Sequence, residues 1–283
     1  MVMMTLAVML STLTLSCHRT PAYQEPVLAV SIQPQRYLLE QIVGDRYQVV
    51  CMLQEGNNPE NYEPGMSNMM ALERCQAYFM MGHIGFEAAL MNKVSANKPD
   101  LKVCDTSQGI TLIGDGHGED GDPHVWTSVA NAKIIARNMY AGMVELDPQH
   151  KDEYTRRHDR LQQHLDSLDK AFRDKLAAGS DTTFIVWHPS LTYFAHDYNL
   201  HQIAIEQEGK ETTPQRIMQV TAQAKKQGTQ VFFYQREFDS RIVQSANDDI
   251  KARLVEISPM SYEWEQQMTL IVDALSHALH PQP

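Results

Sequence analysis

The sequence predicts an α/β protein with two lobes, each built on a four-stranded, mostly parallel sheet flanked by helices, and bridged by one long helix. Three observations predict this fold class. Short apolar runs alternate with helical stretches in both halves of the chain. One charged stretch without glycine or proline separates four such runs from the next four. At 283 residues, with 43% hydrophobic and 21% charged residues, the chain has enough apolar material for buried cores in both lobes.

The first half begins its alternation of strands and helices at Val27. Short apolar runs predict strands at Val27–Ile32, Tyr47–Leu53, Ala77–Met81 and Leu101–Cys104. Helical spacing between and after them predicts helices at Gln35–Val43, Asn68–Arg74, Phe86–Lys93 and Val129–Glu145. A glycine-rich acidic loop at Gly114–Gly121 precedes the last helix, which stops near Pro148. Strands that alternate with helices favour parallel βαβ units with right-handed crossovers.

A long, highly charged helix is predicted between the halves, from Gln149 to about Ala177. This segment contains neither glycine nor proline. Its sparse apolar residues, mostly three, four or seven apart, are Tyr154, Leu161, Leu165, Leu168, Phe172 and Leu176. A helix of about 28 residues measures about 42 Å and can span two lobes. A coiled-coil dimer arm is the alternative, but fewer than four heptads and an imperfect apolar repeat argue against it.

After Gly179 the second half repeats the alternation. The predicted strands are Thr183–Trp187, Gln202–Glu206, Gln230–Tyr234 and Arg253–Ile257. The predicted helices are Leu191–Asp197, Pro214–Gln227, Ser240–Lys251 and Glu263–Leu279. The two halves share no residue-level repeat, so we expect the same architecture to occur twice with different sequences.

The N-terminal segment predicts export. Residues 1–16 are uncharged and mostly apolar, but a membrane span needs about 20 such residues, so the run is interpreted as the apolar region of a signal peptide. Ser16 directly precedes Cys17, which resembles a bacterial lipoprotein cleavage site with Cys17 as the lipid-anchored first residue. An ordinary signal peptide with a chance cysteine is the alternative. The predicted organisation is a signal segment at 1–17, a tether at 18–26, a first lobe at 27–147, a linking helix at 148–178 and a second lobe at 179–283.

Charge and cysteine content exclude two classes of ligand chemistry. The formal charge is −11, whereas a nucleic-acid partner would call for a basic face. Besides Cys17 the chain has Cys51, Cys75 and Cys104, an odd number that allows at most one internal disulfide. None of them has the CxxC spacing of a thiolate zinc site, so cysteine is not expected to bind a metal.

Two histidine segments predict a metal site between the halves. His124 lies in the segment Asp122–Trp126, and His188 follows the apolar strand run ending at Trp187. Imidazole is the commonest protein metal ligand near neutral pH. Ligands of open α/β sheets gather beyond the carboxyl ends of the strands, where His188 is expected to project. The loop after the strand Tyr47–Leu53 brings Glu60 to the same edge.

Together these segments resemble the metal-specific solute-binding proteins of ABC importers, the zinc and manganese binders of the ZnuA/TroA type. Four segments, in order along the mature chain, match the family's motifs: Pro59–Pro64, Asp122–Trp126, the helix that starts at Asp147, and His188 with Tyr193–Ala195. The resemblance implies an exported receptor, periplasmic or on the cell surface and lipid-anchored to the membrane. It would capture a divalent metal ion and pass it to an ABC permease in the cytoplasmic membrane.

Two positions depart from the family's ligand set. The family's first histidine falls on Glu60, and its aspartate ligand falls on Ser258. The resemblance therefore implies a site of Glu60, His124 and His188, because zinc accepts carboxylates as well as imidazoles. Serine is a poor ligand unless it is deprotonated. The fourth position is left to water or to a nearby group, the candidates being Ser258, His83, Glu206 and Gln235.

Several functions remain open at this point. Zn(II) is the favoured ion for two histidines and a carboxylate, with Mn or Fe(II) as alternatives. A surface adhesin stabilised by a metal has the same fold, and a zinc hydrolase would use a similar open site. No His-Glu-x-x-His or Gly-x-Ser-x-Gly motif occurs, so we expect a binding protein rather than an enzyme. The methionine runs at Met66–Met70 and Met80–Met81 are predicted to pack in the core rather than bind copper.

Overall fold

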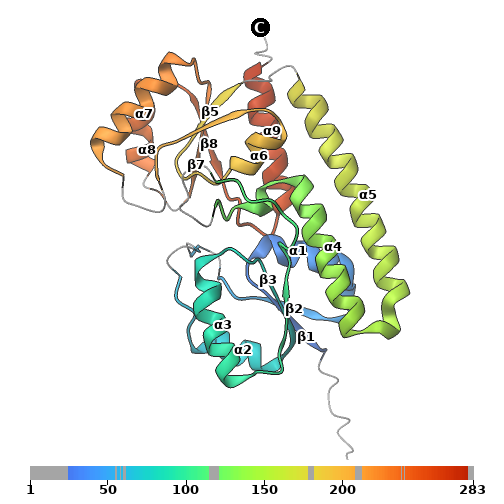
Figure 1. Cartoon of the computed structure of the whole chain (residues 1–283). Coiled ribbons are helices and arrows are strands. Elements are labelled where there is room, and N and C mark those ends of the chain that lie inside the picture. The colour runs from blue at the N-terminus through green and yellow to red at the C-terminus, as the bar shows by residue number, and fades with distance from the viewer. Residues whose placement is uncertain are drawn as a thin grey trace, which may run out of the picture.

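The computed structural model describes residues 25–54, 56–57, 59, 62–114, 121–177, 182–207, 212–236, 238 and 240–279. It confirms the predicted fold class: two four-stranded sheets, flanked by helices and accompanied by one long helix (Figure 1). The predicted signal segment with Cys17, the tether up to residue 24, and Glu60 lie outside the described residues. Within the described part, no helix combines the length and apolar character needed to cross a membrane.

The first sheet contains β1 (Val27–Val30), β2 (Gln48–Cys51), β3 (Cys75–Met80) and β4 (Lys102–Asp105), in the order β2-β1-β3-β4. All its pairings are parallel. The helices of this half are α1 (Gln33–Val43), α2 (Met66–Arg74), α3 (Gly85–Asn97) and α4 (Val129–Leu146). In Figure 1, α2 and α3 lie on one side of the sheet and α4 on the other. All four residues of β1 are buried, as expected for a central strand covered on both faces.

The second sheet has the same topology. Its strands are β5 (Thr183–Val186), β6 (His201–Ala204), β7 (Val231–Gln235) and β8 (Arg253–Ile257), in the order β6-β5-β7-β8. Its helices are α6 (Thr192–Asp197), α7 (Pro214–Lys226), α8 (Ser240–Asn247) and α9 (Trp264–Leu279). All its described pairings are parallel. The architecture therefore occurs twice, and in each sheet the strand that begins the half is central.

The long helix confirms the predicted apolar stripe. A short 3-10 turn (Pro148–His150) leads into α5 (Lys151–Leu176), which runs along one side of both halves (Figure 1). α5 contacts α1 and α4 of the first half and α9 of the second. The predicted stripe faces these helices: Leu168 is partly buried, and the buried residues are Tyr154, Leu161, Leu165, Phe172 and Leu176. The helix joins the halves because one narrow face packs against both.

A continuous apolar core crosses from one half to the other. It includes Leu28 of β1, Phe184 and Val186 of β5, and Trp264 of α9. The alternate residues Ile185 and Trp187 belong to a second cluster under α7 and α8, since successive strand residues face opposite sides of a sheet. α1 is also tied directly to the second half. The Tyr37 hydroxyl donates to Glu265 at 2.9 Å, and the Tyr262 hydroxyl donates to Glu40 at 2.6 Å.

One local prediction is wrong in part and another is wrong. Met81 is buried, and Met69 and Met80 pack against the core, as predicted for the methionine runs. Met66 and Met70 are 76% and 61% exposed, because α2 turns this face to solvent rather than to the core. α8 ends at Asn247 rather than at Lys251. The Asn247 side chain bonds both the carbonyl and the N–H of Ala252, at 2.8 and 3.0 Å, which closes a turn in place of further helix. Cys75 and Cys104 are free thiols, and the Cys51 thiol donates to the Ser31 carbonyl at 3.4 Å.

Candidate metal centre

The carboxyl edge of the second sheet gathers most of the predicted site residues. Val186 of β5 is paired with Ala204 of β6 and with Phe233 of β7. Two residues further along, the same register sets His188 between Glu206 and Gln235. Gln235 of β7 is in turn paired with Ile257 of β8, so Ser258 begins the next loop at this edge. The parallel register therefore explains why four residues far apart in the sequence form one row.

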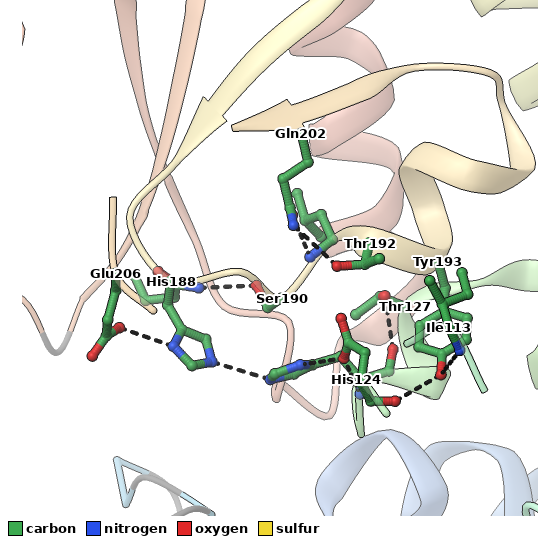
Figure 2. A network of polar contacts seen from close by, with 12 residues as sticks. Ile113, His124, Thr127, His188, Ser190, Thr192, Tyr193, Gln202 and Glu206 are labelled. Atoms are coloured by element: carbon green, nitrogen blue, oxygen red, sulfur yellow. Dashed lines mark hydrogen bonds and ion pairs between the residues drawn. The ribbon is translucent and has the colours of Figure 1, made fainter. Parts of the chain in front are cut away.

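The Nδ1 atom of His188 contacts a carboxylate that fixes the orientation of the ring. Its Nδ1 lies 2.9 Å from Oε2 of Glu206, and both side chains are 12% exposed (Figure 2). A carboxylate at this position accepts the Nδ1 proton, which leaves the Nε2 lone pair for a metal. Glu206, considered above as a fourth ligand, thus contacts Nδ1 of His188, the ring nitrogen that faces away from His124. Its observed contact is that of an orienting partner.

His124 is held in the same way from the other half of the chain. Asp122 Oδ1 lies 2.8 Å from His124 Nδ1 and accepts the His124 backbone N–H, also at 2.8 Å. His124 is only 3% exposed and Asp122 is fully buried. The Tyr193 hydroxyl donates to the Asp122 carbonyl at 2.6 Å. Burial raises the pKa of Tyr193 to about 12, so the phenol stays protonated and remains a donor.

The indole of Trp126 ties the His124 segment to the second half. Trp126 Nε1 donates to the Pro259 carbonyl at 3.1 Å, and Trp264 Nε1 donates to the Trp126 carbonyl at 2.8 Å. Both indoles are almost completely buried. A tryptophan two residues after His124 therefore locks the segment against the loop between β8 and α9. This bond crosses the boundary between the halves and fixes where His124 lies relative to His188.

The Nε2 atoms of the two imidazoles face each other. Nε2 of His124 and Nε2 of His188 are 3.1 Å apart, and Figure 2 shows His188 between His124 and Glu206. Two lone pairs at this distance repel unless a proton or a cation lies between them. In a tetrahedral zinc site with Zn–N bonds of about 2.0–2.1 Å, two nitrogen ligands are about 3.3 Å apart. The separation of the two nitrogens is close to that of two zinc ligands, and it also suits a proton shared between the rings.

A small cavity adjoins the histidine pair. Its volume is about 60 Å³, enough for an ion with little else. Apart from the two histidines, it is lined by residues from both halves: Asn57, Pro59, Trp126, Ser190, Gln235, Phe238, Ser258, Pro259 and Met260. Gln235 is 7% exposed and Ser190 3% exposed. Few polar atoms reach this space, so each of them has a strong effect on what it can bind.

The structure separates the predicted site residues into three groups. His124 and His188 are together, and Gln235 and Ser258 line the cavity beside them. His83 is exposed in the loop after β3 and is not part of the described cavity wall. Glu60 lies outside the described residues, although Pro59 and Asn57 line the cavity. Among the side chains that the structure describes, no group of three histidine, cysteine or acidic residues is placed to hold a metal.

Some functional contacts were not predicted. Ser190 N donates to the His188 carbonyl at 2.7 Å, and its hydroxyl accepts from Gln235. The orienting roles of Asp122 and Glu206 were also missed. Asp122 had a sequence signal, because an aspartate two residues before another residue commonly accepts from that residue's backbone. The contact of Glu206 with His188 depends on strand pairing and left no comparable signal.

Comparison with known proteins matches the chain to one family. The family model described as "Zinc-uptake complex component A periplasmic" matches residues 28–278. The crystal structure of a ZnuA deletion mutant with zinc bound is 32% identical, with a TM-score of 0.85, covering 92% of this chain and 100% of that one. A Chlamydia muridarum protein, named provisionally as metal-binding, is 31% identical over 202 residues, covering 70% of this chain and 71% of the relative.

A more distant structure shares the fold. The structure of the solute-binding protein FpvC of Pseudomonas aeruginosa in complex with Mn²⁺ has a TM-score of 0.78 and 20% identity. It covers 91% of this chain and 99% of that one. At this identity the similarity concerns the arrangement of strands and helices and does not extend to the metal.

Proposed function

The chain belongs to the family of the periplasmic component A of zinc-uptake complexes, and from this premise we propose that it captures Zn(II) between its halves and delivers it to an ABC permease. The family makes it a metal-binding solute-binding protein. The observation that carries the choice of site is the pair of Nε2 atoms 3.1 Å apart, each imidazole backed by a carboxylate. Such backing fixes the ring orientation and raises the basicity of the ligand.

The proposed ligands are His124, His188 and Glu60. Pro59, next to Glu60 in the chain, lines the cavity, which supports a Glu60 carboxylate as the third ligand. One carboxylate beside two neutral imidazoles leaves a bound Zn²⁺ with a net local charge of about +1, tolerable in a small and partly polar site. Two imidazoles favour zinc over Mn(II), which prefers carboxylate, carbonyl and water oxygens. Mn(II) and Fe(II) are therefore expected to bind more weakly.

The proposed activity is binding and release rather than turnover. A cavity of about 60 Å³ has room for an ion but not for an ion together with an organic substrate. The family match is to a transport receptor, which agrees with this limit. We expect the metal to reach the permease from the outer side of the cytoplasmic membrane, since the family is described as periplasmic.

The membrane anchor is proposed at Cys17. Lipidation there would keep the receptor close to its permease through the polar stretch after residue 17. Cys17→Ala is expected to release the protein from membranes in a cell fractionation and to abolish labelling with a radioactive fatty acid. Labelling of the Cys17→Ala protein equal to that of the parent would exclude this anchor.

Metal analysis tests the central proposal. Protein purified without added metal is analysed for its metal content and then titrated with Zn(II), Mn(II) and Fe(II) in competition with a chelator. We expect zinc to bind most tightly in a ratio of one ion per chain. Binding of none of these ions, or tighter binding of Mn(II) than of Zn(II), would contradict the proposal.

Variants at Glu60 and Ser258, the two positions that depart from the family's ligands, test which residues bind the metal. Glu60→Ala should lower zinc affinity at least about tenfold, whereas Ser258→Ala should leave it nearly unchanged and serves as the matched control. Ser258→Asp places a carboxylate on the cavity wall and should tighten binding. An unchanged affinity of Glu60→Ala would remove Glu60 from the site.

A further inference from the structure

Gln235 is the polar side chain of the cavity whose bonding is incomplete. It ends β7, beside His188 at the carboxyl edge of the second sheet, and it lines the same cavity as both histidines. Its side-chain Nε2 donates to the Ser190 hydroxyl at 3.0 Å. Its side-chain Oε1 is buried and has no hydrogen-bond donor among the described residues. A buried acceptor without a partner costs about 1–3 kcal/mol.

Ser190 bonds the nitrogen end of the Gln235 amide. The Ser190 backbone N–H donates to the His188 carbonyl at 2.7 Å, so the serine belongs to the same turn as the proposed ligand. Its hydroxyl occupies the Gln235 Nε2 group. The carbonyl end of the amide is left without a donor among the residues that the structure describes. The same turn thus positions His188 and orients the amide of Gln235.

Gln35 and Gln202 are two glutamines in which both ends of the side-chain amide are bonded. Gln35 is fully buried, yet its Oε1 accepts from Ser31 N and Ile32 N, and its Nε2 donates to Phe79 O and Thr106 Oγ1. Gln202, on the strand beside β5, has Oε1 bonded to Leu191 N at 2.8 Å and Nε2 bonded to Thr192 Oγ1 at 3.0 Å. Among these three amides, the one with an unbonded oxygen lies in the wall of the histidine cavity.

We infer that the Gln235 side-chain carbonyl supplies an oxygen ligand to the captured ion and sets how well Mn(II) competes with Zn(II). This inference rests on the proposed metal-binding function. A carbonyl oxygen is a neutral, hard donor of the kind that suits Mn(II) more than Zn(II), whereas imidazole suits Zn(II). The amide oxygen carries no net charge. It therefore raises the affinity for Mn(II) without the stronger attraction for every divalent cation that a second carboxylate would add.

The side chain also explains how the fourth position is filled. The family's aspartate position is occupied by Ser258, whose hydroxyl is a weak ligand. Gln235 and Ser258 follow each other in the row of strand ends, and both line the cavity. The amide oxygen therefore lies at the edge that would otherwise offer the ion only a hydroxyl or water. A structural water bonded to Oε1 is the competing explanation, and it gives Gln235 no influence on metal choice.

Substitutions at Gln235 separate these explanations by their effect on the ratio of Mn(II) to Zn(II) affinity. Gln235→Leu removes the oxygen at similar volume, and Gln235→Glu keeps it and adds a charge. We expect Gln235→Leu to weaken Mn(II) binding at least about tenfold and Zn(II) binding less, and Gln235→Glu to strengthen Mn(II) binding by at least about tenfold. Gln202→Leu is the matched control one strand away and should leave the ratio unchanged.

X-ray absorption of the Mn(II)-loaded protein gives a second measurement. We expect the Mn(II) ion to have one oxygen neighbour fewer in Gln235→Leu than in the parent. A ratio that stays within about twofold in both Gln235 variants, with equal losses for both ions, would overturn the inference. Thermal unfolding of the metal-free variants shows whether they fold, and if Gln235→Leu does not, Gln235→Glu alone decides the outcome. A parent protein that binds neither ion would instead refute the proposed function.

Discussion

The carboxyl edges of the two sheets have the same strand order but opposite chemistry. In the first sheet the polar side chains at this edge bond to one another and to nearby backbone, and they form a closed network. At the edge of the second sheet, His188 and Gln235 line a cavity together with His124 from the first half. Two imidazole nitrogens and the unbonded amide oxygen of Gln235 therefore lie in one region. The same position in the fold therefore has different chemistry in the two sheets, and the second edge differs by having two imidazoles beside a cavity.

Around Glu87 the polar side chains of the first edge are joined by hydrogen bonds, although the buried Oε1 of Gln33, at the start of α1, lacks a partner among the described residues. Glu87 is 1% exposed and accepts from Met81 N at 2.6 Å, from Gly82 N at 2.8 Å and from the Ser31 hydroxyl. Ser31 also bonds the Tyr78 hydroxyl at 2.6 Å. A buried polar network whose members are all bonded makes the local structure rigid and has nothing left for a ligand. We therefore assign this edge a structural role.

The largest effect is expected at the two imidazoles, His188 at the second edge and His124 facing it from the first half of the chain. His124→Ala or His188→Ala removes a proposed ligand and should lower zinc affinity by more than about 100-fold, beyond the loss for a supporting partner. Competition with a chromophoric chelator measures this loss. Each variant should keep the circular dichroism spectrum of the parent. Zinc affinity within about tenfold of the parent in both variants would place the site elsewhere.

A smaller loss is expected when the carboxylate behind an imidazole is changed. Glu206→Gln keeps the size of the side chain but no longer attracts the Nδ1 proton of His188, so zinc affinity should fall by about 10–100-fold. Glu256→Gln is the control, because Glu256 pairs with the exposed Arg236. Equal affinities of the Glu206→Gln and Glu256→Gln proteins would show that the contact with His188 has no role in binding.

A pair of serines tests the comparison directly. Ser31 follows β1 and Ser190 follows β5, the equivalent strands of the two sheets. Ser31→Ala should lower the free energy of unfolding by about 1–2 kcal/mol and leave zinc affinity unchanged. Ser190→Ala should release the Gln235 amide and change the affinity for Mn(II). Urea unfolding and metal titration of both variants measure these effects, and a change in metal affinity caused by Ser31→Ala would break the comparison.

The smallest effect concerns the pH dependence of stability. Burial raises the pKa of Glu87 above its usual range, against the hydrogen bonds that lower it. A carboxyl group whose pKa is higher in the folded than in the unfolded chain adds stability at acid pH, and that stability is lost as the pH rises through the folded-state pKa.

The free energy of unfolding of the parent, relative to Glu87→Gln, should therefore fall as the pH rises from the unfolded-state pKa of Glu87 through its raised folded-state pKa. Urea unfolding at several pH values measures this difference. Asp105→Asn is a control at the same edge of the first sheet. A difference that stays constant or grows with pH would show that the pKa of Glu87 is not raised.

Much of the fold could be predicted from the sequence because it depends on local patterns. Runs of four to seven residues identified the eight strands of the described residues, and the stripe from Tyr154 to Leu176 identified the face of α5 that packs. The predicted end of a helix was wrong where a side-chain hydrogen bond stabilised a turn in place of further helix. Asn247 ends α8 by bonding Ala252, and the sequence between them gave no indication of that turn. The lobe limits remain predictions.

The sequence by itself determined the family, the two-sheet architecture and the two histidines, because motifs, periodicity and residue chemistry are written along the chain. Only the tertiary structure decided what surrounds those histidines. The parallel register places Glu206 and Gln235 on either side of His188, and the Trp126 bond to Pro259 brings His124 within 3.1 Å of it. The physical reason is that hydrogen bonding and burial depend on distances between strands and loops far apart in sequence, and no local pattern records them.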